Sequence, residues 1–525
     1  RDVAPSRGLG DVYKRQGLQK LLKDGLLLFN YTGHGGTTAL SDEKVLTQTD
    51  INQFTYTHLP VWVTATCDFT RFDDLNTSAG EDVFLNKSSG GIALFTTVRV
   101  AYSRPNFPIN DNVIRNLFER NNGRRRTLGE VMQATKNTLS SVYKLGFCLI
   151  GDPAVKMAYP EFGMKVTTVN GQSVDGNSIS FKALEKITVE GEVLDVSGQL
   201  VTDFTGIVNP TVKDSKVTVT CLKNSNKDDS PAFTFTDYPN TIFIGNDSVR
   251  NGKFSFTFTV PKDISYSNLQ GKMNLYAVDT ESGNEAQGNF DNFIVGGTSD
   301  TAETDTIGPE IRALYLNDTT FVDGGQVNTT PYFVAELWDK SGVNITGSSV
   351  GHDMMLVIDE STVLSYNLNS YYELLPGEDG TGIVKFPIPA LEPGKHTAEF
   401  WVWDILNNST VRTFTFEVVE GLKPFLFDVI ATPGIAREQV TFHLMHNRPE
   451  SRMRVGIMVY DLAGRQLWKH EESGTSGLFE NYTVSWDLTS GGVRMRPGVY
   501  IYRAAISTDN SKDATKARKF IILGE

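Results

Sequence analysis

The fold of the N-terminal region is decided by the stretch Val61-Trp62-Val63-Thr64-Ala65-Thr66-Cys67-Asp68. Its apolar and β-branched residues predict a buried strand that ends just before the cysteine. One predicted strand earlier, the run 26–31 leads into Thr32-Gly33-His34-Gly35-Gly36. If these two strands are neighbours in a parallel sheet, His34 and Cys67 meet in the crevice beyond the strand ends, where open α/β folds place their sites.

Helix and strand patterns alternate around this stretch. A third apolar strand is predicted at 92–97 and a fourth at 147–150, with helices at 80–85, 109–119 and 127–143. Such alternation predicts an α/β domain over residues 17–160, built on a parallel sheet that helices cover on both faces.

The pattern changes near residue 160. From there, strands of alternating polar and apolar residues follow one another with Gly, Asn, Asp and Pro between them, which predicts β-sandwiches. Polar breaks divide this part into 161–298, 306–421 and 425–525, and the last segment contains a hairpin signal with its turn at 461–464. Residues 1–16 lack periodicity and are interpreted as non-native read-through, so we expect the natural upstream part, with its export signal, to be missing.

Composition narrows the class of protein. The chain has 525 residues, a net charge of −13 and a pI near 5.2, which argues against nucleic acid as a partner. Its cysteines, Cys67, Cys148 and Cys221, form neither a disulfide framework nor a zinc-type pair. We expect no metal site and no cofactor, although the sequence leaves a structural calcium ion open, and no apolar run reaches the length of a membrane span.

Nucleophilic chemistry is favoured at Cys67 because it leaves its strand into a polar segment, whereas Cys148 and Cys221 are expected to be structural. The glycines around His34 indicate a positive φ or a close approach to the backbone. The backbone N–H groups of Gly35 and Cys67 are candidate donors to an oxyanion. The remaining histidines are expected to be structural or exposed: His58, His352, His396, His443, His446 and His470.

The residues of these motifs resemble the gingipain family of cysteine peptidases. The resemblance covers about residues 20–160 and includes Tyr-Thr-Gly-His-Gly-Gly, Thr-Ala-Thr-Cys-Asp 33 positions later (67 − 34), and the closing Gly151-Asp152-Pro153. It implies a caspase-like α/β core and a cysteine endopeptidase, with His34 as general acid and base and Cys67 as the acylated nucleophile. It further implies a histidine-orienting carboxylate upstream of this chain and a substrate pocket formed by Arg99, Tyr102 and Ser103.

The C-terminal segment resembles the sorting domain of proteins exported by the type IX secretion system of Bacteroidetes. The features that carry this resemblance are Pro433, the runs 459–464 and 497–500, and the terminal 519–523. Together with the gingipain-like core, they imply a sortase-like surface peptidase that cleaves C-terminal sorting domains from exported cargo. The implied location is the outer-membrane surface or the extracellular space. The implied partners are such cargo, outer-membrane components of the same system, and a lipopolysaccharide amine acceptor.

Two alternatives stay open at this point. One is a secreted general gingipain-like protease, for which the terminal domain is its own export tag. The other is a non-catalytic surface adhesion protein that binds through its sandwiches.

Overall fold

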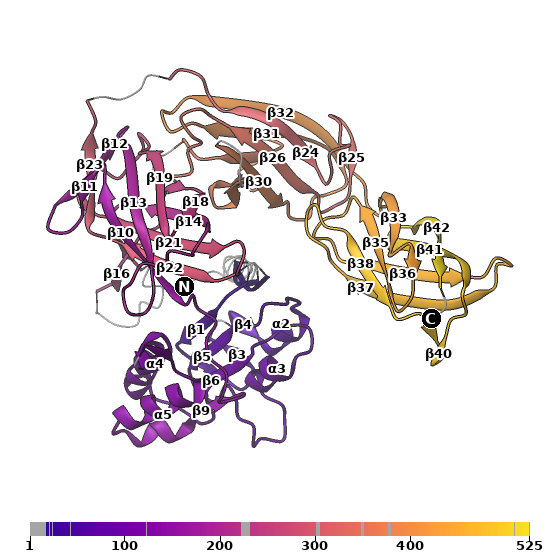
Figure 1. Cartoon of the computed structure of the whole chain (residues 1–525), viewed down its shortest axis with the longest axis horizontal. Helices are drawn as coiled ribbons and strands as arrows, with labels where there is room; N and C mark the ends of the chain where they lie inside the picture. The colour runs from indigo at the N-terminus through magenta and orange to yellow at the C-terminus, as the bar shows by residue number, and fades with distance from the viewer. Residues whose placement is uncertain are drawn as a thin grey trace. The chain divides into compact units, whose positions relative to one another are not determined.

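The computed structural model describes residues 17–523 apart from 20, 24, 43, 122, 222–230, 301–304, 348–350, 376–379 and 509, and the predicted read-through segment 1–16 lies outside the described residues. The chain forms two compact units (Figure 1). The first contains the described residues up to Gly163, together with Leu194–Gln199 and the described part of 219–235. The second contains the rest of the chain.

The first unit is organised around a four-stranded sheet in the order β1-β5-β6-β9. Its strands are β1 (Leu28–Thr32), β5 (Val61–Ala65), β6 (Ala93–Thr97) and β9 (Phe147–Ile150). β1, β5 and β6 pair in parallel, and every residue of β5 and β6 is buried. Continuous burial is typical of a parallel strand that is covered on both faces.

Helices cover both faces of this sheet, as the sequence predicts. On one face, Val63 and Phe95 pack against α4 (Ser103–Phe118) and α5 (Leu128–Thr138). On the other face, Trp62 and Leu94 join a cluster that contains Ile51 of α2 (Gln48–Gln53) and Val83 of α3 (Ala79–Leu85). Because side chains alternate along a strand, neighbouring residues of β5 serve opposite cores.

One strand departs from the all-parallel prediction, because β9 pairs with β6 in the antiparallel direction. Two helices, α4 and α5, stand in succession between β6 and β9. With a single crossover helix, the next strand would enter the sheet at the end where β6 begins and would run parallel to β6. After two helices in succession, the chain enters at the opposite end, so β9 runs antiparallel to β6. The predicted helix 127–143 is also shorter than expected: α5 ends at Thr138, and a separate 3₁₀ helix, η1 (Val142–Gly146), leads into β9.

The second unit is all β. Its first part contains a nine-stranded sheet and a three-stranded sheet, β12-β23-β20. The longer strands here are β10 (Phe162–Val169), β12 (Ile179–Ala183), β13 (Lys186–Leu194), β14 (Gly206–Lys213), β19 (Lys253–Thr259), β21 (Lys272–Asp279), β22 (Glu285–Phe290) and β23 (Phe293–Thr298), with the short β20 (Leu269–Gln270). In β19 the phenylalanines are buried and the residues between them exposed, which gives a strand with one core face.

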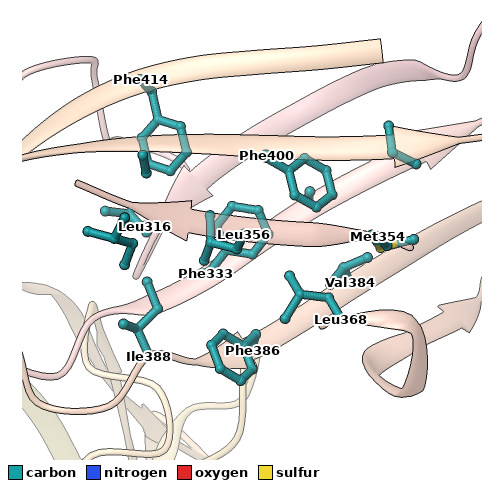
Figure 2. Close-up of a cluster of buried hydrophobic side chains, with 14 of the residues drawn as sticks. Leu316, Phe333, Met354, Leu356, Leu368, Val384, Phe386, Ile388, Phe400 and Phe414 are labelled. Carbon is teal, nitrogen blue, oxygen red and sulfur yellow. The ribbon is translucent and has the colours of Figure 1, made fainter. Parts of the chain in front are cut away.

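The next part packs a four-stranded sheet against a five-stranded sheet around a shared core. Its main strands are β24 (Glu310–Leu316), β26 (Tyr332–Trp338), β27 (Met355–Ile358), β30 (Thr381–Pro387), β31 (Gly394–Trp403) and β32 (Ser409–Val418). Figure 2 shows the core, in which the ring centroid of Phe333 lies 5.0 Å from that of Phe400. These facing side chains bury the inner surfaces of two sheets, which is the arrangement of a β-sandwich.

The last part contains a three-stranded and a five-stranded sheet. Its main strands are β33 (Leu426–Thr432), β35 (Val440–His446), β36 (Met453–Tyr460), β37 (Gln466–Gly474), β38 (Tyr482–Trp486), β41 (Gly498–Ser507) and β42 (Ala514–Ile522). The predicted hairpin is present: β36 pairs with β37, and the Gly464 N–H donates to the Asp461 carbonyl across the turn.

Candidate active site

The parallel register of β1 and β5 brings His34 and Cys67 to the same edge of the sheet. Thr32 pairs with Ala65 at the ends of the two strands, and the Gly33 N–H continues the pairing with a hydrogen bond of 3.4 Å to the Ala65 carbonyl. His34 and Cys67 each stand two residues beyond these strand ends. Neighbouring strands are about 4.8 Å apart, so the two turns leave the sheet side by side.

Hydrogen bonds fix the backbone of His34, whereas its side chain is exposed to solvent. Its carbonyl accepts the Tyr31 hydroxyl at 2.6 Å and the Ser41 N–H at 2.8 Å. A Cβ atom on Gly33 would lie 2.8 Å from the Tyr31 hydroxyl oxygen, so the tyrosine side chain closely covers this glycine. The turn is thus fixed by its own neighbours, and the imidazole is left accessible.

Gly35 is required by close packing rather than by a left-handed backbone. A Cβ atom at this position would lie 2.5 Å from Oγ1 of Thr66, the residue before Cys67. None of Gly33, Gly35 and Gly36 has a positive φ, so the close approach accounts for the glycine at Gly35. The histidine turn and the cysteine turn are therefore in direct contact at Gly35 and Thr66.

The turn after Cys67 is sharp and is tied to the end of β6. Asp68 has a φ of +49°, a left-handed conformation that non-glycine residues rarely adopt, and its N–H donates to the Arg99 carbonyl at 3.3 Å. The Thr66 carbonyl accepts the Thr97 hydroxyl at 2.5 Å. The half-buried thiol of Cys67 donates to the Ala101 carbonyl at 3.1 Å. In the described part of the chain, the thiol makes this contact and not one to His34.

The three predicted pocket residues have different surroundings. Arg99 forms a two-pronged ion pair with Asp73, at 3.0 and 2.6 Å, which holds the pKa of the Asp73 carboxyl below its ordinary value. Tyr102 is exposed, and its ring meets that of Tyr143 edge to face at 5.3 Å between centroids. Ser103 begins α4, and its side chain lies outside the described residues.

Sequence reasoning did not identify the contacts of Thr66, Ala101 and Tyr143 with this site. The acidic residues after Cys67 are a visible signal for an arginine partner. However, Asp73 and Arg99 are separated by 26 positions, and no local pattern pairs them.

A comparison with known protein families finds a match in the N-terminal part of the chain. Residues 5–158 match peptidase family C25. The match indicates a cysteine peptidase and agrees with the resemblance of the His34 and Cys67 motifs to the gingipains. No curated protein matches the sequence.

The solved structures that are similar to the chain include one of PorU and one of a gingipain. One is the crystal structure of dimeric latent PorU from Porphyromonas gingivalis, which is 35% identical, covers 98% of this chain and 47% of its own, and has a TM-score of 0.34. The other is the Arg-specific cysteine proteinase gingipain R, with 19% identity, coverage of 54% of this chain and 56% of its own, and a TM-score of 0.26. The chain therefore spans about half of the PorU structure.

Outside the C25 domain, His352, His396, His446 and His470 hydrogen-bond to neighbouring side chains. His352 hydrogen-bonds to Asp263 and His396 to Asp359, and burial lowers the pKa of His446 to about 4.

Of the two cysteines expected to be structural, Cys148 is half-buried, but Cys221 is exposed, so its predicted burial is wrong. Cys221 stands after the short β15 (Val217–Thr220), whose alternate residues are exposed. Among the described residues, none of the helices has the length and apolar character that a membrane span needs.

One group of described residues has the ligand chemistry of a divalent-cation site. Oxygens of Asp305, Asp339 and Asp404 lie within 4.8 Å of one another, and Asp339 and Asp404 are almost fully buried. Burial raises the pKa of Asp339 to about 6, and it also raises the pKa of Asp404. Carboxylates in this position oppose folding when they are ionised without a counterion.

The contact between Gly35 and Thr66 makes a testable prediction. Gly35→Ala places a methyl group against Thr66 Oγ1 and should move the histidine turn away from Cys67, which we expect to lower the rate of Cys67 acylation by about tenfold or more. Gly36→Ala is the matched control, because a Cβ atom there has nothing within 4 Å. Acylation of folded variants can be followed by intact-mass spectrometry. Equal loss in both variants would refute the packing argument.

The raised pKa of Asp339 predicts how stability depends on pH. The folded carboxyl holds its proton up to about pH 6 and the unfolded one only to about 3.8, so this group's stabilisation is present at low pH and is lost as the pH rises through that window. Asp339→Asn should therefore raise the melting temperature at pH 7 without divalent cations, with the gain vanishing near pH 4.

Asp323→Asn provides a control of opposite sign. Its carboxylate accepts hydrogen bonds from the Thr415 N–H and hydroxyl, which lower its pKa, so this variant should be less stable at pH 7. Thermal unfolding at several pH values measures both effects. A lower melting temperature for Asp339→Asn at pH 7 would contradict the assignment.

Proposed function

We propose that the C25 domain is a cysteine endopeptidase that uses Cys67 and His34. The observation that carries the proposal is the in-register pairing of β1 and β5, which places both side chains two residues past adjacent strand ends. His34 takes the Cys67 proton, and the thiolate attacks the peptide carbonyl carbon. When the tetrahedral intermediate collapses, the imidazolium gives the proton to the leaving amine, and the acyl group remains on sulfur as a thioester.

Gly35 is suited to stabilise the oxyanion of that intermediate. Its strand, β2 (Gly35–Gly36), pairs with β3 (Ala39–Leu40), and the Ser41 N–H donates to the His34 carbonyl. Hydrogen-bonded and non-hydrogen-bonded pairs alternate along an antiparallel ladder. The pair of Gly35 with Leu40 is thus a non-hydrogen-bonded one, and the Gly35 N–H is directed away from β3. This N–H and that of Cys67 are the proposed donors.

The hydrogen bond from the Cys67 thiol to the Ala101 carbonyl corresponds to the site before catalysis begins. A carbonyl oxygen accepts a proton from the neutral S–H group but repels a thiolate. For catalysis, the Cys67 side chain therefore has to leave Ala101 and approach His34, a rotation about one side-chain bond. Catalytic hydrogen bonds are often absent before substrate binds, so the observed contact is compatible with the proposed dyad.

The finer proposal is that the substrates are exported proteins with C-terminal sorting domains. It is supported by the sorting-type sequence of residues 425–525 in this chain, which indicates the same export route. Cleavage before a cargo's sorting domain would leave cargo on Cys67, and a lipopolysaccharide amine or water would then release it. This activity belongs at the outer-membrane surface, next to other components of the export system.

Labelling with a thiol-directed acyl electrophile tests the dyad. In a Cys221→Ala background, which removes the exposed thiol, the protein should be acylated once. In that background, Cys67→Ala should lose the label, and His34→Ala should react at least a hundredfold more slowly. Cys148→Ala is the matched control and should react as wild type does. Peptide mapping by mass spectrometry identifies the modified residue. Labelling of Cys67→Ala equal to that of wild type would refute the proposal.

The finer proposal has a separate test. Incubation with a fusion protein that ends in a type IX sorting domain should release that domain, and should leave residues 425–525 attached to the enzyme itself. Cys67→Ala should release nothing. If the enzyme instead loses its own terminal domain and cleaves unrelated proteins equally well, the alternative of a secreted general protease would be favoured.

A further inference from the structure

Several apolar side chains on the segment that follows β6 and on η1 are exposed rather than buried. Tyr102 is 60% exposed and Leu145 is 70% exposed, and Val100, Val142 and Tyr143 are exposed as well. We refer to these five residues as the apolar surface. Large apolar side chains that are exposed together in one region commonly mark a binding site.

The apolar surface is physically continuous with the proposed nucleophile. The carbonyl that accepts the Cys67 thiol belongs to Ala101, whose chain neighbours are Val100 and Tyr102. The Tyr102 ring then contacts Tyr143 of η1. The end of η1 is fastened to the same segment, because the Val98 N–H donates to the Gly146 carbonyl at 2.8 Å.

The two cations in this region, Arg99 and Lys144, are already engaged. Arg99 binds both oxygens of Asp73, and a Cβ atom on Gly146 would lie 3.4 Å from the Arg99 Cβ, so η1 packs against the base of this side chain. Lys144, which lies between Tyr143 and Leu145, donates its ammonium protons to the carbonyls of Lys136 and Leu139. Neither cation is directed at a ligand on the apolar surface.

We propose that the apolar surface selects the substrate of Cys67 by binding an uncharged, apolar side chain of the polypeptide next to the scissile bond. Two tyrosine rings in edge-to-face contact offer a large apolar area with little conformational freedom to lose. An acidic side chain there would be desolvated without a cation to pair with, because Arg99 and Lys144 already bind other groups. This inference rests on the proposed peptidase function, and it assigns specificity to Tyr143 and Leu145 in addition to Tyr102.

Matched acyl probes test the specificity. Two dipeptide electrophiles differ only in the residue next to the reactive carbonyl, which is phenylalanine in one and glutamate in the other. Wild-type protein should be acylated at Cys67 about tenfold or more faster by the phenylalanine probe. Tyr143→Ser and Leu145→Ser should lose most of this preference, whereas Leu75→Ser, at a fully exposed position of the same domain, should keep it.

Iodoacetamide carries no amino-acid side chain that the apolar surface could bind. Its reaction rate therefore measures the reactivity of the Cys67 thiol without any contribution from substrate specificity. Its rate at Cys67 should be the same in all four proteins. Equal rates of the two peptide probes on wild type, or an unchanged preference in Tyr143→Ser and Leu145→Ser, would overturn the specificity assignment alone. Alkylation of Cys67 by iodoacetamide without acylation by either peptide probe would refute the proposed function.

Discussion

The candidate site depends on the register between β1 and β5. A slip of one residue would turn every β5 side chain to the opposite face and would also offset the two turns. Packing on both faces prevents this slip: the Trp62 ring lies 4.0 Å from Phe29, and its indole N–H donates to the Gly90 carbonyl at 3.2 Å. On the other face, Val63 is completely buried. The core therefore determines where His34 stands relative to Cys67.

Close packing continues from the core into the two turns. Gly35 has to be glycine because the Thr66 side chain occupies the space of a Cβ atom, and Asp68 takes up a left-handed conformation directly after the nucleophile. Backbone strain of this kind, about 1–3 kcal/mol per residue, persists only where the surroundings hold it, and it is common at functional sites. Here hydrogen bonds from Thr97 and to the Arg99 carbonyl supply that support.

The all-β unit follows a simpler physical rule. In β19, β31 and β42, residues that alternate in polarity place one face inward, and each sandwich closes around the apolar faces of two sheets. The second sandwich also holds a cluster of acidic residues, in which Asp305, Asp339 and Asp404 come together from separate loops. Loops carry such groups because strands leave no room for them in a core that is packed throughout.

Local patterns in the sequence were sufficient to predict the buried strands, the helices on both sheet faces, the sandwiches, the hairpin at Asp461–Gly464, and His34 and Cys67 as candidates. These features depend on residue periodicity and on neighbours a few positions away. Only the tertiary structure decided the direction of β9, the partner of Arg99, the contact of Tyr102 with Tyr143, and the hydrogen bond from Cys67 to Ala101. Each of these joins residues between 26 and about 55 positions apart. Which of these pairs form depends on how whole helices and strands pack and on which side-chain rotamers then fit. Neither packing nor rotamer choice produces a periodic pattern in the sequence.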